Sequence, residues 1–312
     1  MLAFVGTKTK NRINKAFENQ QFTGSQIAQM KYRMTKTQLI QKSIMYRKKI
    51  LQYIYRAKAG HTGGSLSCID ILNVLYNHVL NVGPKTFSSP DRDRFVQSKG
   101  HTVEALYVVL ADRGFFPESD LETLCQYQSH YIGHPTKKVH GIEQNTGALG
   151  HGLSLSVGMA ISAKMDEKDF RVFTLLGDGE LPEGSNWEAA LTASHYKLDN
   201  LCAVIDHNKL QISGTTQEVC NTSPIDSKFE SFGWAVREVD GHDIEALMET
   251  FDSLPFETGK PSLILAHTVK GKGVSYMENA LKWHHGVPDT SQYAQAQDEL
   301  DEEMAKTLAQ AN

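Results

Sequence analysis

The sequence has few cysteines and no long hydrophobic run. Its four cysteines, at positions 68, 125, 202 and 220, lie far apart and form no Cys-x-x-Cys pair. This spacing argues against a metal cluster or a disulfide framework and favours free thiols in a reducing cytoplasm. No apolar run approaches the roughly 20 residues that a membrane span needs, and the N-terminus shows no apolar signal-peptide core. We therefore expect a cytoplasmic protein with no membrane partner.

An excess of charge of either sign is also missing. The formal net charge is -4 and the pI is about 6.4, so the chain carries no electrostatic footprint for nucleic acid. With 312 residues, 40% of them hydrophobic, it can bury a substantial core. The composition fits one large α/β domain or two small ones.

The stretch that organises the chain reads as strand, helix, strand. Apolar runs predict strands at 172–176 and 201–205, and residues 183–196 predict a helix between them. Asp178 and Asn208 each fall just past a strand, and such ends share one edge of a parallel sheet, where ligands bind. A carboxylate and an amide oxygen held there suit magnesium, with phosphate and water completing its shell. Gly-Asp-Gly alone is an ordinary turn, but the matched Asn208 favours the metal site.

The N-terminal part of the chain divides into three segments. Residues 1–34 are polar and basic. They are either a mobile arm or residues upstream of the true initiator, which would then be Met34. We favour the second alternative. Apolar residues at helical spacing predict a helix over 35–59. A glycine-bearing loop containing His61 then leads into an amphipathic helix from about Ser67.

Several histidines stand at turns. His101 lies where a helix begins after a short strand, and the free amides and dipole of a helix N-terminus favour anions, so this imidazole can donate to a phosphate. Three more, His130, His134 and His140, are too irregularly spaced for a zinc site. A lone loop histidine is usually a solvated bystander, so these residues need further support.

A second glycine loop precedes an apolar helix that runs to about residue 163. Gly147, Gly150 and Gly152 allow the backbone to approach a flat ligand closely. The alternative is structural: Gly152 and Gly158 permit close helix packing.

These motifs together resemble a known family. Gly-Asp-Gly followed thirty residues later by Asn resembles the thiamine diphosphate signature. The longer pattern, GDG-xxx-EG-xxx-EA before DHNKLQISG, is similar to the form of this signature in transketolases. The resemblance runs from about Thr35 to Pro288 and matches only the N-terminal, diphosphate-binding half of a full-length transketolase. It implies an α/β thiamine diphosphate-binding fold with a mostly parallel central sheet and helices on both faces. The expected domain spans 35–290, and 291–312 form an acidic helix and tail.

The resemblance also implies roles for individual residues. The magnesium ligands would be Asp178, Asn208 and the backbone carbonyl of Leu210. The cofactor would contact His101, Gly147, Ala148, Leu149, Gly179, Asn208 and His285. The donor sugar would meet the catalytic histidines His61, His134 and His285. Here His285, and not His284, aligns with the family's His-Gly-x-Pro.

Two carboxylates have a separate implied role. Glu183 and Glu188 match residues that join a carboxylate network at the subunit interface, although carboxylates at helical spacing commonly form a solvated face. The chain departs from the family at Thr62, where proline is usual, and at His151, where glutamine is usual.

The implied reaction is transfer of a two-carbon ketol unit from a ketose phosphate to an aldose, with thiamine diphosphate and magnesium. The family's second, pyrimidine-binding domain is missing, so we expect a separate C-terminal subunit that completes an α2β2 assembly. Two alternatives stay open: the α subunit of a 2-oxoacid dehydrogenase, and a non-catalytic regulatory subunit that binds the cofactor. The sequence does not identify the sugar.

Overall fold

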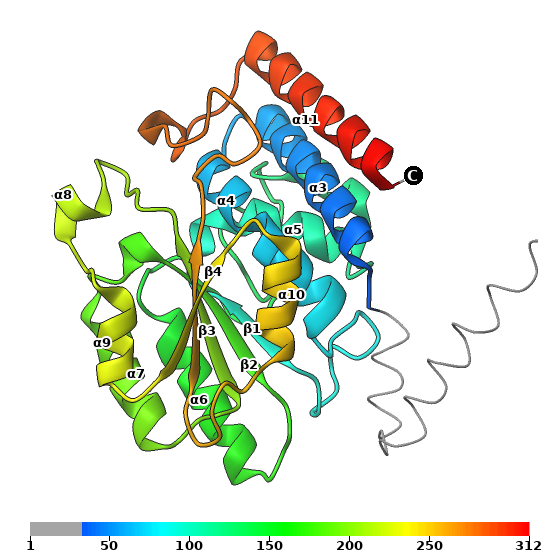
Figure 1. The fold of residues 1–312 in the computed structure, drawn as a ribbon. Coiled ribbons are helices and arrows are strands. Elements are labelled where there is room, and N and C mark those ends of the chain that lie inside the picture. The colour runs from blue at the N-terminus through cyan, green and yellow to red at the C-terminus, as the bar shows by residue number, and fades with distance from the viewer. Residues whose placement is uncertain (1–32, 312) are drawn as a thin grey trace, which may run out of the picture. The chain divides into compact units, whose positions relative to one another are not determined.

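The computed structural model describes residues 33–311, and the described residues from Thr35 onward belong to one compact unit (Figure 1). The alternatives for the N-terminal segment, an arm or a start at Met34, concern residues that lie almost wholly outside this range. Within the described range, no helix is long and apolar enough to cross a membrane.

A five-stranded sheet forms the centre of the unit. Its strands are β1 (Arg94–Gln97), β2 (Val172–Gly177), β3 (Leu201–His207), β4 (Ala235–Asp240) and β5 (Ser262–His267). The spatial order is β1-β2-β3-β5-β4 and every neighbouring pair is parallel, which confirms the predicted sheet. The strands β2 and β3 are buried along their whole length, because helices cover both faces of the sheet.

The helices lie on both faces of the sheet, as predicted (Figure 1). They are α3 (Lys36–Ala57), α4 (Thr62–Val74), α5 (Val103–Asp112), α6 (Gly152–Met165), α7 (Gly184–His195), α8 (Thr216–Cys220), α9 (Ile225–Ser231), α10 (Ile244–Asp252) and α11 (Thr290–Ala311). On one face, α6, α7 and α9 share an apolar core with Val172, Leu201 and Leu263 of the sheet. On the other face, Phe251 of α10 packs against Phe173, and α10 also contacts α3 and α4.

The segment around His61 differs from the prediction. Helix α4 begins at Thr62 rather than near Ser67, and all of its residues are buried, so it is not amphipathic. Gly63 and Gly64 therefore lie in its first turn. A Cβ on Gly63 would lie 2.9 Å from the carbonyl oxygen of Trp283, and one on Gly64 would lie 2.7 Å from Cγ2 of Thr102. The glycines thus serve close packing, which the periodicity of the sequence does not reveal.

Two further boundaries were wrong. Strand β3 continues through Asp206 and His207, because both pair with β5. The stretch 215–227, for which the sequence patterns suggested no helix, contains α8 and the start of α9. Thr215 and Glu218 form a reciprocal capping box that explains the start of α8.

The C-terminal helix packs against the N-terminal one. Figure 1 shows α11 beside α3, and the rings of Tyr55 and Tyr293 stack with centroids 4.5 Å apart. Lys48 and Asp301 form an ion pair along the same contact. The acidic helix thus contributes to the packing of the unit.

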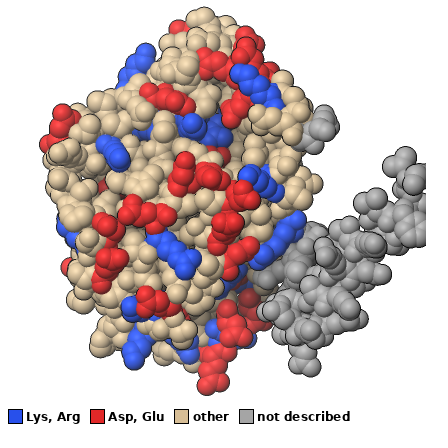
Figure 2. All heavy atoms as spheres, viewed as in Figure 1, with Lys and Arg blue, Asp and Glu red and all other residues tan. Residues whose placement is uncertain are grey.

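Charged side chains are mixed over the visible surface. On the face in Figure 2, Lys and Arg alternate with Asp and Glu, and no continuous basic area stands out. That face has no surface suited to a phosphate backbone.

Candidate active site

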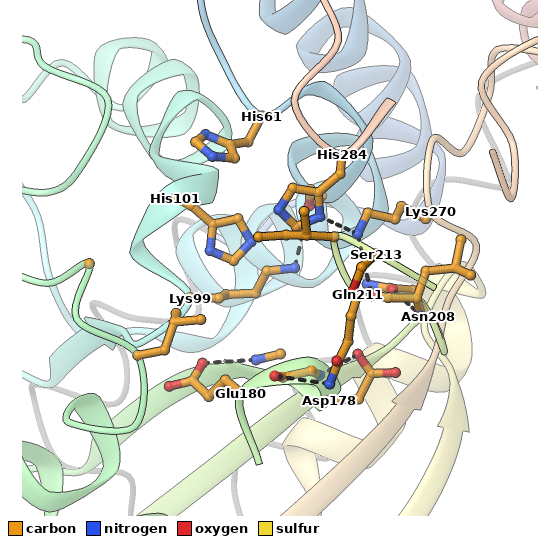
Figure 3. A pocket seen from close by; sticks show the side chains of 17 residues that line it. His61, Lys99, His101, Asp178, Glu180, Asn208, Gln211, Ser213, Lys270 and His284 are labelled. Carbon is orange, nitrogen blue, oxygen red and sulfur yellow. Dashed lines mark hydrogen bonds between the residues drawn. The ribbon is translucent and has the colours of Figure 1, made fainter. Parts of the chain in front are cut away.

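A cavity of about 320 Å³ opens at the carboxyl ends of the strands (Figure 3). It is lined by His61, Gly64, Lys99, His101, Gly147, Leu149, Gly177, Asp178, Gly179, Glu180, Asn208, Leu210, Gln211, Ile212, Ser213, Lys270 and His284. Eight of the residues singled out from the sequence line this one space: His61, His101, Gly147, Leu149, Asp178, Gly179, Asn208 and Leu210.

The sheet register brings the predicted metal ligands together. Gly177 is paired with Asp206, so Asp178 and Asn208 emerge side by side from β2 and β3. The carboxylate of Asp178 accepts backbone N–H bonds from Gly179 (2.8 Å) and Lys209 (2.5 Å). Burial and the nearby charge of Asp206 raise the pKa of Asp178 to about 7. A nearby cation would stabilise the ionised form of this buried carboxylate.

The donor set fits a hard divalent cation. The side-chain oxygens of Asp178 and Asn208 and the carbonyl of Leu210 belong to residues of the same cavity wall. Among the described residues, no Lys, Arg or His forms an ion pair with Asp178. Nor does that part of the chain contain a cluster of three or more His, Cys, Asp or Glu arranged for a metal. One carboxylate with neutral oxygens is the kind of site that magnesium completes with phosphate and water.

A buried ion pair lies at the wall of the cavity. The ammonium of Lys99 contacts the carboxylate of Asp206, which also accepts hydrogen bonds from the hydroxyls of Ser67 and Thr268. Burial alone would lower the pKa of Lys99, but the charge of Asp206 outweighs it and raises that pKa. Lys99 therefore keeps its positive charge inside the protein.

Lys270 is a second lysine of the cavity, and neither it nor Lys99 was predicted from the sequence. The Nζ of Lys270 lies 2.7 Å from Nδ1 of His284 and 3.3 Å from the carbonyl oxygen of Leu210. Burial and the charge of Lys99 lower the pKa of Lys270 to about 8. Lys270 follows β5 in a Lys-Gly-Lys-Gly run, and a basic residue just past a parallel strand was an available signal that we did not use.

His61 stands at the centre of a histidine cluster. Its ring centroid lies 5.2 Å from that of His101, 6.0 Å from His134, 5.7 Å from His284 and 4.4 Å from His285. Burial, with the neighbouring His285 and His134, lowers the pKa of His61 to about 4. Its buried Nδ1 has no hydrogen-bond partner in the described part of the chain, as expected of a group that faces a ligand.

The structure distinguishes the two adjacent histidines. His284, which the family motif leaves out, lines the cavity and stacks on His101 with centroids 5.5 Å apart. His285 does not line the cavity; it is exposed and lies against His61. His134 also borders His61 without lining the cavity. The motif alone could not show which side chain turns inward.

The second glycine loop is held tightly in place. Gly147 has a φ of 139°, and a Cβ there would lie 2.6 Å from the ring of His134. The N–H of Gly150 donates to the buried carboxylate of Glu180 (2.9 Å), which also accepts from the N–H of Gly177 (3.1 Å). Glu180 thus joins this loop to the end of β2, a role that its sequence position did not suggest.

Of the two glycines that the structural alternative assigned to close helix packing, only Gly152 lies in such a contact. A Cβ on Gly152 would collide with Ser98, whereas one on Gly158 would meet no atom within 4 Å. Ala148 and His151 are exposed at the edge of the loop.

The two predicted interface carboxylates lie outside the cavity. Glu183 is the N-cap residue of α7 and Glu188 lies on the same helix, and both are exposed. Leu191, also on α7, leaves 59% of its surface exposed.

Comparison with known proteins agrees with this geometry. Residues 40–308 match the family model described as "Transketolase, thiamine diphosphate binding domain". The chain is 50% identical over 266 residues to a protein of Phocaeicola vulgatus that is named as one subunit of an apulose-4-phosphate transketolase, covering 85% of this chain and 95% of that one. It is 40% identical over 260 residues to the 6-deoxy-6-sulfo-D-fructose transketolase subunit SqwG of a Clostridium species, covering 83% and 94%.

A solved structure shows the same fold. The transketolase of Campylobacter jejuni superposes with a TM-score of 0.75 at 30% identity, covering 87% of this chain. Only 48% of the longer chain is covered, so this chain spans about half of that enzyme. The described fold, the cavity and these matches together show that the chain belongs to the transketolase family and corresponds to its thiamine diphosphate binding domain.

Proposed function

We propose that this chain is the thiamine diphosphate binding subunit of a two-chain transketolase, acting with magnesium and a separate subunit that carries the pyrimidine-binding half. The observation that carries the proposal is that one cavity brings together the buried carboxylate of Asp178, two lysines and a set of imidazoles. The chain covers almost the whole length of two relatives that are named as transketolase subunits, which supports a divided enzyme. We further propose an α2β2 assembly in the cytoplasm, in line with the four free cysteines.

The residues of the cavity suit the cofactor. Magnesium would be held by Asp178, Asn208 and the carbonyl of Leu210, and the ammonium groups of Lys99 and Lys270 would face the diphosphate together with His101. The buried Nδ1 of His61 has no hydrogen-bond partner among the described residues, so it is available to a ligand in the cavity. When bound, thiamine diphosphate supplies the carbanion chemistry of ketol transfer.

The remaining histidines would handle the sugar. Burial lowers the pKa values of His61 and His134, so both imidazoles are neutral near pH 7 and can accept a proton from a hydroxyl or donate a hydrogen bond to one. His285, exposed beside His61, would meet the same substrate from the open side. Gly147, Ala148 and Leu149 would border the cofactor, and Gly179 leaves room for its diphosphate.

The surface of α7 is the proposed contact with another subunit. Glu183 and Glu188 are exposed there, and Leu191 presents apolar surface one turn from Glu188. The proposal rests on the match of Glu183 and Glu188 to interface carboxylates of the family and on their exposure on one helix.

The donor that we propose is a ketose that carries an anionic group. The identities of 50% and 45% to two proteins named as apulose-4-phosphate transketolase subunits favour apulose 4-phosphate as the first donor to try. The 40% identity to a sulfofructose enzyme makes a sulfonated ketose the second.

Reconstitution with the complementary subunit tests the reaction class. We expect the mixture to lengthen an aldose by two carbons at the expense of a ketose phosphate and to leave 2-oxoacids untouched. Release of CO₂ from a 2-oxoacid, with acyl transfer to lipoamide, would instead support the α subunit of a dehydrogenase.

A further inference from the structure

Each residue from Val269 to Lys272 forms a hydrogen bond through its backbone. The N–H of Val269 donates to Nε2 of His242 (2.8 Å), and the carbonyl of Lys270 accepts from the N–H of Asn279 (2.8 Å). The N–H of Gly271 donates to the carbonyl of Gly63 (2.9 Å). The carbonyl of Lys272 accepts from Nε of Arg47 (3.0 Å). The backbone is therefore bonded on both sides of Lys270.

Two of these bonds come from side chains that share one carboxylate. Arg47 on α3 makes a forked contact with Asp70 on α4, at 3.1 Å from Nη1 and 2.5 Å from Nη2. His242, in the turn before α10, lies with Nδ1 2.8 Å from the same carboxylate. The side chains of Arg47 and Asp70 are only 5% and 4% exposed. Three elements thus meet at one buried carboxylate.

The contacts define the tautomer of His242. Because Val269 N–H points at Nε2, that nitrogen must accept, and the ring proton resides on Nδ1, where it is donated to Asp70. Burial alone would raise the pKa of Asp70, but the Arg47 charge and the His242 hydrogen bond outweigh it and keep that pKa below its usual range. Asp70 therefore stays ionised and orients both partners.

We propose that Arg47, Asp70 and His242 form a clamp that positions the ammonium of Lys270 in the cavity for the cofactor's diphosphate. None of the three lines the cavity, so they are positioning residues and act through the backbone at Val269 and Lys272. The inference rests on the proposed function, because it takes the diphosphate as the anion that Lys270 meets.

Two substitutions at one position separate the effect from general destabilisation. His242→Gln can place an acceptor near the position of Nε2, whereas His242→Asn keeps a donor for Asp70 but is too short to reach Val269. His78→Asn is the matched control, because His78 also bonds an aspartate, Asp252, and neither residue lines the cavity.

The first measurement is hydrogen exchange in the chain without cofactor. We expect His242→Asn to speed exchange in the peptide that contains Val269, and His242→Gln and His78→Asn to leave that peptide close to wild type. Equal exchange in all three variants would overturn the clamp regardless of any cofactor.

The second measurement is thiamine diphosphate affinity with magnesium, for the full chain together with its partner subunit. We expect His242→Asn to weaken binding about tenfold, as for loss of one hydrogen bond near a charged group. In a Lys270→Met background, the same change should have no further effect, because the group being positioned is gone. Equal losses with and without Lys270 would overturn the inference while leaving the proposed function intact. If the wild-type complex bound no thiamine diphosphate, both would fail.

Discussion

The side chains of Lys270 and His284 meet at the wall of the cavity, with 2.7 Å between Nζ and Nδ1. Burial and the Lys270 charge lower the pKa of His284 to about 3, so its imidazole is neutral and Nδ1 accepts from the ammonium. The next residue, His285, is exposed beside His61. Two consecutive histidines thus face different parts of the site.

This division predicts different defects for the two histidines. We expect His284→Ala to weaken thiamine diphosphate binding about tenfold, since it removes a partner of Lys270. His285→Ala should leave cofactor affinity near wild type and raise the KM for the ketose donor. Steady-state kinetics and cofactor titration of the reconstituted enzyme measure both. A cofactor defect in His285→Ala alone would favour the motif alignment over the geometry.

Asp178→Asn should abolish the magnesium dependence of cofactor binding. Removing the carboxylate leaves only neutral oxygens, and we expect thiamine diphosphate affinity at saturating magnesium to fall about 100-fold, at the upper end of losses seen when the support of a metal ligand is removed. Titrations with and without magnesium measure this. Asp169→Asn, an exposed position with the same charge change, serves as the control. Unchanged magnesium dependence in Asp178→Asn would rule out the proposed metal site.

Lys99→Met should destabilise the fold, because it leaves Asp206 buried without its cation. Loss of one partner of a buried ion pair costs about 3–5 kcal/mol of unfolding free energy. The double variant Lys99→Met/Asp206→Asn should recover at least half of that loss. Urea denaturation of the three proteins tests this, and a double variant no more stable than Lys99→Met would show that the pair is not the cause.

Glu104 predicts a dependence of stability on pH. This buried carboxylate accepts bonds from the N–H of His61 and the hydroxyl of Ser65, yet burial raises its pKa to about 7. The raised pKa contributes stability that is complete below the unfolded value near 4.5 and is lost as pH rises through about 7. Glu104→Gln stays neutral, so relative to wild type it should gain about 2 kcal/mol of unfolding free energy between pH 5.5 and pH 8. Denaturation curves at both pH values give the difference, and a constant difference would refute the titration.

The sequence predicted the parts of the site that have local signatures. Asp178 and Asn208 follow apolar strands, so their shared edge could be inferred from the parallel topology. Glu180 could not be assigned, because its partner Gly150 lies 30 residues away. The position of Lys270 just past β5 was a local signal, but its contact with Leu210, 60 residues away, was not. The start of α4 was misplaced because Gly63 and Gly64 resemble a loop until their close neighbours, Trp283 and Thr102, are known.

The most direct test of the divided enzyme is ketol transfer to ribose 5-phosphate, with xylulose 5-phosphate and apulose 4-phosphate as donors, in magnesium and thiamine diphosphate. The chain is assayed alone and then with the subunit that carries the missing half. We predict turnover only in the mixture. Turnover by the chain alone at an ordinary enzyme rate, on the order of 10 per second, would contradict the account, because this chain would then need no partner.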